Sequence, residues 1–245
     1  MIGSIHADGW SILEKKGCDV FEITDFSSDN LINKLHDVDG IALRTVKLTS
    51  NILKKCNNLK IVARHGVGYD NVDLNYLNNK GIALAITGTS NAISVAEHVM
   101  TMFLSICKMS KLSDQLVRDG KFMEKSSLPG CFELYKKNIL IIGFGRIGKV
   151  LAKQCLGFDS IVYVYDPFID ASIIKENNCF PIGFEEGLNI ADFVSLHIPL
   201  NENTKDMIAK DHLIMMKNTC ILVDFHKNTC TESTVFKDLV DYTKT

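Results

Sequence analysis

The chain has 245 residues, of which 46% are hydrophobic and 23% are charged, and this average composition argues against a disordered chain or a collagen-like rod. Lys and Arg total 27 against 29 Asp and Glu, so the excess of basic residues that nucleic-acid or anionic-membrane binding would require is missing. No uncharged apolar run reaches the ~18 residues of a transmembrane helix, and no basic leader precedes a long apolar stretch, so we expect a cytoplasmic protein.

Helical and strand patterns alternate along the first part of the chain, which favours an α/β fold with a mainly parallel sheet. In order, we expect the end of a helix at 11–16, a strand at 20–23, helices at 29–35, 49–56 and 74–79, and strands at 40–43, 59–63 and 82–86. Thr49 is the expected N-cap of the second of these helices. The strand at 59–63 leads into a glycine-bearing turn, Gly66-Val67-Gly68.

A second series of elements follows a small, polar loop at 87–91. The apolar spacing of 93–109 predicts the longest helix of the chain, bridging two α/β units, and a more charged helix follows at 111–125. Further along we expect strands at 137–142, 161–165, 193–197 and 220–223, and helices at 146–156, 170–177, 205–215 and 232–240. The predicted organisation is therefore two doubly wound parallel-sheet domains, at 1–90 and 91–245, the first flavodoxin-like and the second Rossmann-like.

Eight cysteines are spread along the chain, and their spacing argues against a metal site. None forms a C-x-x-C pair, and no histidine cluster stands beside them, so zinc is not expected. Most lie in apolar segments, such as Cys107 and Cys220. We expect reduced thiols that pack as small hydrophobic side chains.

The most informative motif is Gly143-Phe144-Gly145-Arg146-Ile147-Gly148, which directly follows a predicted buried strand and opens a helix. In this context Gly143 permits a tight turn, Gly145 lets the backbone approach a pyrophosphate, and Gly148 lets helix and strand pack closely. The amides at the helix N-terminus, where Arg146 and Ile147 stand, would then face the phosphates. The motif predicts a dinucleotide-binding turn.

Asp166 supplies the second part of this prediction, because it stands at the end of the next strand. A carboxylate there can accept hydrogen bonds from an adenosine ribose and would repel a 2′-phosphate. Since no Arg or Lys follows in Asp166-Pro167-Phe168, the sequence favours NAD over NADP. Two alternatives remain open: S-adenosylmethionine, whose binding folds also place an acid after the second strand, and a plain glycine cap beside a surface Asp.

Four stretches in this order resemble the D-isomer-specific 2-hydroxyacid dehydrogenases, most closely the phosphoglycerate dehydrogenase branch. They are residues 63–73, residues 91–98, the glycine turn, and residues 191–200. The resemblance implies an oxidoreductase that moves a hydride between NAD and a 2-hydroxy acid, with 3-phosphoglycerate as one candidate. It also implies a small 2-hydroxy or 2-keto acid as partner and a homodimer formed near helix 93–109.

The resemblance assigns roles to particular residues. Gly66, Val67 and Gly68 match the turn whose backbone amides hold the substrate carboxylate, and Val67 would also lie beside the nicotinamide. Arg44 is placed like a substrate-contacting arginine. His197, Ile198 and Pro199 would line the adenosine side of the cofactor, with no role for His197 as a proton carrier.

The family pattern breaks after the strand at 220–223. Lys227 occupies the position of the family's substrate-polarising arginine, and a lysine lacks the bidentate guanidinium fork. The family's glutamate and histidine belong beyond Thr245, so the resemblance implies an NAD-binding domain that is truncated and a substrate domain that lacks most of its first strand. Two hypotheses follow: an NAD-dependent 2-hydroxyacid dehydrogenase with impaired catalysis, or a non-catalytic NAD-binding protein or remnant of a truncated or frame-shifted gene.

Overall fold

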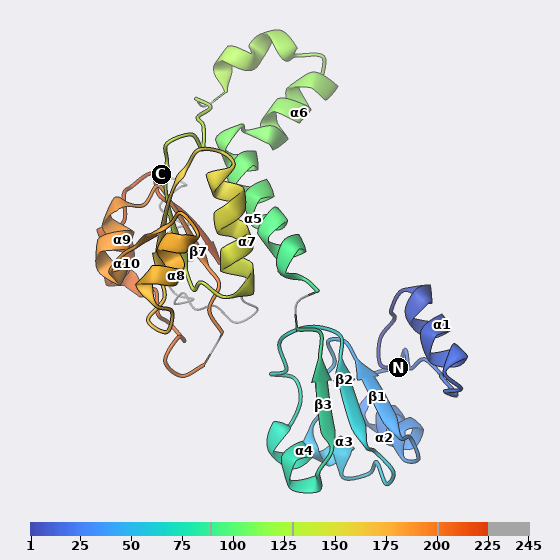
Figure 1. Cartoon of the computed structure of the whole chain (residues 1–245). Helices are drawn as coiled ribbons and strands as arrows, with labels where there is room; N and C mark the ends of the chain where they lie inside the picture. The colour runs from blue at the N-terminus through green and yellow to red at the C-terminus, as the bar shows by residue number, and fades with distance from the viewer. Residues whose placement is uncertain (89, 129, 200, 225–245) are drawn as a thin grey trace. The chain divides into compact units, whose positions relative to one another are not determined.

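The computed structural model describes residues 1–88, 90–128, 130–199 and 201–224, and the chain forms two compact units, Met1–Asn91 and Ala92–Thr245. Each unit has an α/β fold built on a parallel sheet (Figure 1). The predicted fold class, α/β with two parallel sheets, is therefore confirmed.

The first unit contains a three-stranded parallel sheet in the order β1-β2-β3. Its strands are β1 (Gly40–Leu43), β2 (Ile61–Arg64) and β3 (Ala83–Ile86), and its helices are α1 (Ala7–Lys15), α2 (Ser28–Leu35), α3 (Ser50–Leu53) and α4 (Leu74–Lys80). The register places Leu43 beside Arg64 and Arg64 beside Ile86. The loops that leave β1 and β2 therefore start side by side at the carboxyl edge of this sheet.

One face of this sheet carries the core of the first unit. Because side chains alternate between faces along a strand, Ile41, Leu43 and Val62 point to the same side and are fully or almost fully buried. Leucines and isoleucines of three helices pack against them, namely Leu31, Leu35, Ile52, Leu53 and Leu77. This packing fixes the strand ends from which the carboxyl-edge loops start.

The second unit contains a five-stranded parallel sheet in the order β6-β5-β4-β7-β8. Its strands are β4 (Asn138–Ile142), β5 (Ile161–Tyr165), β6 (Phe180–Pro181), β7 (Phe193–Leu196) and β8 (Ile221–Asp224). The chain enters at the centre with β4, adds β5 and β6 on one side, and then continues on the other side with β7 and β8. The strand order therefore reverses between β4 and β7, and in open α/β sheets ligands bind at the carboxyl edge of such a switch point.

The second unit contains helices that pack on both faces of its sheet and others, α6 (Ser110–Arg118) and the 3-10 helix η1 (Phe122–Ser127), that do not belong to its core. The helices on the two faces are α5 (Ala92–Cys107), α7 (Arg146–Leu156), α8 (Ala171–Glu176), α9 (Phe184–Ile190) and α10 (Lys210–Met215). On the face of α5 and α7, the Phe103 and Phe193 rings lie 4.7 Å apart between their centres. On the opposite face, Leu140 and Val194 pack with Leu188 of α9. In the described part of the chain no single helix is long and apolar enough to cross a membrane. Only α5 and α6 taken together reach the required length and hydropathy, and the two helices are bent by 63° relative to each other.

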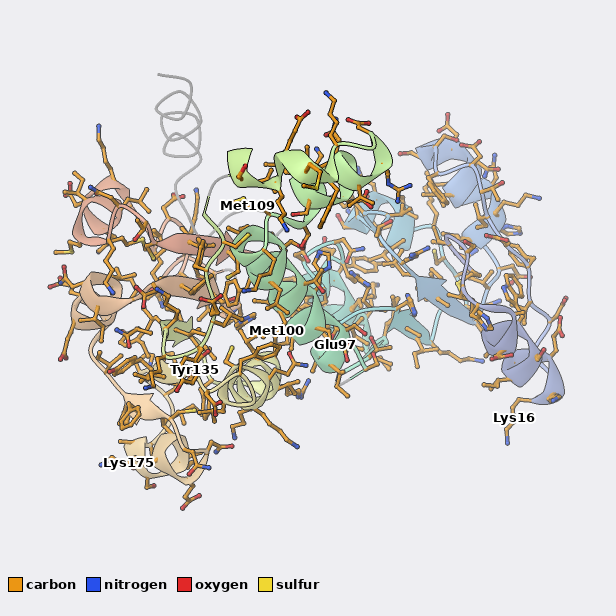
Figure 2. All side chains as sticks on the ribbon, turned by 90° about the horizontal axis from the view of Figure 1, so that it is seen from above. Lys16, Glu97, Met100, Met109, Tyr135 and Lys175 are labelled. Carbon is orange, nitrogen blue, oxygen red and sulfur yellow. The ribbon has the colours of Figure 1, made fainter. Side chains whose placement is uncertain are left out.

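The contact between α5 and α7 ties the long helix into the second unit. Met100, labelled on α5 in Figure 2, lies with its sulfur 3.6 Å from Sγ of Cys155 on α7. Ala96, Val99 and Phe103 are fully buried on the same helix. The predicted bridging helix therefore belongs to the core of one unit.

Several predicted elements differ in extent. The strand expected at 20–23 is reduced to one bridge, between Ile23 and Ile2. The helix expected at 111–125 ends at Arg118, because Gly120 follows with a φ of 70°. Thr49 is the N-cap of α3, as predicted, but its side chain makes no capping bond. The helix expected at 205–215 begins only at Lys210, and the helix expected at 232–240 lies outside the described residues.

Two elements were not predicted at all. β6 has two residues and includes Pro181, and a proline is tolerated only at such an edge position. The helix α9 follows directly, and its sequence Phe-Glu-Glu-Gly-Leu-Asn-Ile carries a glycine in its centre, which lowers its helical propensity. Glycine nevertheless suits position 187, because a Cβ there would lie 2.8 Å from the Leu140 side chain and would displace this buried leucine.

The seven described cysteines are all free thiols. Cys107, Cys155 and Cys179 are buried, and burial raises the pKa of Cys155 to about 12 and that of Cys179 to about 11. Cys18 and Cys131 are exposed, which differs from the expected packing. Among the described residues no three His, Cys, Asp or Glu side chains are grouped to hold a metal ion.

Candidate functional site

The glycine turn connects β4 to α7 at the switch point of the second sheet. Gly143 has a φ of 95°, a left-handed conformation that a residue with a side chain rarely adopts. A Cβ at this position would lie 2.6 Å from the His197 carbonyl oxygen, and one at Gly148 would overlap the Gly143 carbonyl oxygen. Glycine is therefore required at both positions for the turn to pack against the chain leaving β7 and against its own helix.

Gly145 differs from the other two glycines of the turn because open space lies beside it. A Cβ built there meets no atom within 4 Å, the residue is exposed, and no side chain caps the helix that starts after it. Arg146 and Ile147 form the first turn of this eleven-residue helix. The backbone at Gly145 can therefore be approached closely, and the helix N-terminus attracts negative charge, so the turn fits a pyrophosphate.

Asp166 follows the last residue of β5 and is held against the glycine turn. Its Oδ2 accepts a hydrogen bond from the Phe144 amide at 2.7 Å, and its Oδ1 accepts one from the Phe168 amide at 2.9 Å. Because a carboxylate has about four acceptor positions, each oxygen keeps a lone pair for a further donor. The structure thus brings Asp166 and the glycine turn together, in the arrangement that an adenosine ribose beside a pyrophosphate would need.

The chain leaving β7 forms the third side of this region. The His197 amide donates to the Ile142 carbonyl at 2.7 Å, and Nε2 of the His197 ring lies 2.8 Å from Oγ of the buried Ser195. Ile198 also lies close to Gly143, since its Cγ2 would be 2.9 Å from a Cβ there. His197 is therefore anchored by a backbone bond to β4 and by a side-chain bond to Ser195 of β7, and with Ile198 it borders the glycine turn.

In the first unit, the turn Gly66-Val67-Gly68 follows the carboxyl end of β2. Gly66 has a φ of 148°, and a Cβ there would overlap the Arg64 guanidinium. The Gly66 amide donates to the Arg64 carbonyl at 2.9 Å, and the Gly66 carbonyl accepts from the Thr87 amide at 3.2 Å. The turn is thus fixed by β2 and by the segment that follows β3.

Arg64 is a candidate site residue that the sequence analysis missed. Its exposed fraction is 7%, its Nε donates to Oδ1 of Asn71 at 3.3 Å, and its Nη1 donates to the His65 carbonyl. No Asp or Glu of the described chain forms an ion pair with it. A buried cation whose hydrogen-bond partners are both neutral can take up an anion. The sequence signal for this residue is an arginine at a strand end, two residues before a glycine turn.

Arg44 lies at the carboxyl edge of the neighbouring strand, one residue beyond β1. It is exposed, and its Nη1 donates a long hydrogen bond of 3.4 Å to the Ser4 carbonyl. Because Leu43 pairs with Arg64, both arginines start from the same edge of the sheet. Lys227, the residue in place of the family arginine, lies outside the described residues, which end at Asp224.

Comparison with known proteins identifies relatives of this arrangement. Residues 100–238 match the family model described as D-isomer specific 2-hydroxyacid dehydrogenase, NAD binding domain. D-3-phosphoglycerate dehydrogenase of Methanocaldococcus jannaschii is 30% identical over 222 residues, which cover 90% of this chain and 42% of that protein. Hydroxypyruvate reductase of Thermotoga maritima is 33% identical over 217 residues, covering 86% of this chain and 68% of that protein.

A solved structure extends the similarity to 98% of the chain. D-lactate dehydrogenase of Aquifex aeolicus, determined in complex with NAD and lactic acid, superposes with a TM-score of 0.86 at 27% identity, covering 98% of this chain and 73% of that one. The chain spans less than half the length of the D-3-phosphoglycerate dehydrogenases it matches. The resemblance found in the four sequence stretches is confirmed: the chain belongs to the D-isomer specific 2-hydroxyacid dehydrogenase family, and its second unit carries the NAD-binding domain of that family.

Proposed function

We propose that this chain binds NAD at the carboxyl edge of β4 and β5, with the pyrophosphate at Gly143–Gly148 and the adenosine ribose at Asp166. The observation that carries the proposal is the bond between Oδ2 of Asp166 and the Phe144 amide at 2.7 Å. This bond fixes an acid beside a turn whose middle glycine is open. No basic residue follows Asp166 directly, which supports NAD over NADP. In this proposal His197, Ile198 and Pro199 line the adenosine side.

We further propose that the first unit is the substrate domain and binds the carboxylate of a 2-hydroxy or 2-keto acid. The amides of Val67 and Gly68 would hold the carboxylate, as backbone amides in a turn do for anions, while the Gly66 amide donates to the Arg64 carbonyl and fixes the turn. Arg44 and Arg64 start from the same sheet edge, so two guanidinium groups favour an acid with a second anionic group, such as 3-phosphoglycerate. When bound, NAD takes up or supplies the hydride that interconverts the hydroxy and keto acids.

A second candidate function is binding of both ligands without turnover. The observation that favours it is Lys227 at the position of the family arginine. An ammonium group offers a point charge where the family uses a planar, bidentate donor. The two candidates share every binding residue proposed above and differ only in the rate of hydride transfer.

The ribose contact is tested by Asp166→Ala. We expect the Kd for NADH, measured by calorimetry, to rise about 10–100-fold, because hydrogen bonds to a charged acceptor are lost. Asp170→Ala is the matched control, since Asp170 also accepts a backbone amide, from Ser172 at 2.8 Å, at the start of α8. Equal Kd values for Asp166→Ala and the wild type would contradict the assignment.

Two glycines of the turn are expected to respond differently to substitution. Gly148→Ala would force a methyl group onto the Gly143 carbonyl and lower the free energy of unfolding by about 2–3 kcal/mol. Gly145→Val enters open space from a φ of −74°, so it should keep the fold but weaken NADH binding at least tenfold by blocking the pyrophosphate. Thermal unfolding and calorimetry on both variants check this; NADH binding by Gly145→Val at wild-type affinity would refute the close approach.

Steady-state assays with NADH and a panel of 2-keto acids separate the two candidate functions. Turnover above roughly 1 s⁻¹, within the ordinary range of enzymes, would establish the dehydrogenase and exclude binding without turnover. If Lys227 limits the rate, Lys227→Arg should raise kcat about tenfold, the value of one additional charge-assisted hydrogen bond. An unchanged kcat in Lys227→Arg would show that this position does not determine the rate.

We also propose a homodimer formed by α5, α6 and η1. The helix α6 has no buried residue, and large apolar side chains of these elements are 36–84% exposed, namely Met102, Ile106, Leu112, Val117, Phe122 and Met123. A second copy of the chain would bury them.

A charge placed in this apolar group should prevent association. Val117→Asp is expected to convert a dimer into a monomer in sedimentation velocity, because an unpaired carboxylate would have to be buried. Ile12→Asp, at a residue of α1 that is 62% exposed, is the control and should leave the dimer intact. A wild-type chain that sediments as a monomer at micromolar concentration would refute the proposal.

A further inference from the structure

The side chain of Asn71 makes a hydrogen bond at each end of its amide group. Nδ2 donates to the Val46 carbonyl at 2.8 Å, and Oδ1 accepts from Nε of Arg64 at 3.3 Å. Val46 belongs to the loop after β1, whereas Arg64 ends β2. One half-buried side chain therefore connects the two loops that carry the candidate anion-binding groups of the first unit.

The backbone around Asn71 reinforces this connection. The Leu48 amide donates to the Asn71 carbonyl at 2.7 Å, and the Asp73 amide donates to the Leu48 carbonyl at 3.2 Å. Leu48 is fully buried, and it pairs with Val72 in an isolated parallel bridge. The segment after β1 is thus bonded to residues 71–73. The Asn71 side chain adds a bond to Val46, two residues after Arg44, and a bond to Arg64.

We propose that Asn71 is a positioning residue of the acid-binding site, which orients the Arg64 guanidinium toward the anion and fixes the loop that carries Arg44. This inference rests on the proposed function. Arg64 is long and flexible, and an arginine side chain loses about 2 kcal/mol of rotamer entropy when it is fixed. Because Asn71 holds Nε, this entropy is already lost when the chain folds and is not lost again when the ligand binds. The Nη groups keep N–H donors for an anion.

The chemistry of an amide suits this position better than that of a carboxylate. An aspartate at 71 could accept from Arg64, but it has no donor for the Val46 carbonyl and would neutralise the cation that the ligand needs. An alanine loses both bonds. Asn71→Asp and Asn71→Ala therefore separate the two tasks of the side chain, since Asn71→Asp keeps Arg64 in place while it competes with the ligand.

The first experiment needs no ligand. Hydrogen–deuterium exchange by mass spectrometry on Asn71→Ala should show faster exchange in segments 44–48 and 65–68, with α4, β3 and the whole second unit unchanged. Asn79→Ala, an exposed asparagine on α4, is the matched control and should exchange like the wild type. Wild-type exchange in both segments of Asn71→Ala would overturn the positioning role, whether or not the chain binds an acid.

The second experiment measures how the acid binds. By calorimetry with 3-phospho-D-glycerate and with D-lactate, Asn71→Ala should raise Kd about tenfold, and Asn71→Asp should raise it further although Arg64 stays ordered. In a double-mutant cycle, Asn71→Ala should cause a smaller loss once Arg64→Ala is present, because only the bond of Asn71 to the loop that carries Arg44 is then left to remove. Additive losses would overturn the inference.

The NADH affinity of these variants should stay at the wild-type value, since it depends on the second unit. A wild-type chain that binds NADH but neither acid would refute the proposed substrate site, and the exchange experiment would then decide alone whether Asn71 positions Arg64. Loss of NADH binding in Asn71→Ala would mean that the substitution disturbs the whole chain, which contradicts a local positioning role.

Discussion

The close approach of two backbone segments at Gly143 is the constraint on which the second unit depends. The chain that leaves β4 and the chain that leaves β7 come so near that a Cβ would lie 2.6 Å from the His197 carbonyl oxygen. The two segments meet because β4 and β7 are paired neighbours, with Ile142 beside Leu196. The strand order reverses at this point, so beyond the contact the two chains continue to opposite faces of the sheet. The contact leaves the open side of the turn at Gly145, beside the fixed carboxylate of Asp166.

The elements with a strong local signal were predictable from the sequence. β1, α7 and β5 have the predicted bounds, because an apolar run that ends at a charged residue, or a helix opened by a glycine turn, is a local feature. The strand expected at 20–23 does not form, because only Ile23 of this segment forms a β-bridge, with Ile2. Whether a segment pairs with another depends on distant parts of the chain and is not a local feature. β6 and α9 were missed because a proline and a central glycine oppose the local preference, and tertiary packing decides there.

The candidate site likewise contains residues that the sequence could predict and one, Arg64, that it could not. Gly143, Gly145, Gly148 and Asp166 could be recognised from their spacing, because one strand-turn-helix unit and the next strand end bring them together. Arg64 could not, because its importance comes from burial and from partners that are all neutral. A sequence shows that an arginine stands before a glycine turn, whereas only the folded chain shows that no carboxylate of the described residues neutralises it.

The carboxyl edges of the two sheets carry different groups for the anions proposed to bind there, and this difference follows from their loops. In the second unit the proposed phosphate site consists of backbone dipoles at the start of α7, and Asp166 is the acceptor proposed for the ribose hydroxyl groups. In the first unit, Arg44 follows β1 and Arg64 ends β2 at the same edge of the sheet, so arginine side chains supply the positive charge of the proposed acid site. Gly66 has a φ of 148°, which favours glycine, and the Arg64 guanidinium lies in the space that a Cβ there would occupy. A side chain at position 66 would therefore displace the buried cation, which connects the conformation of the amide turn to the position of Arg64.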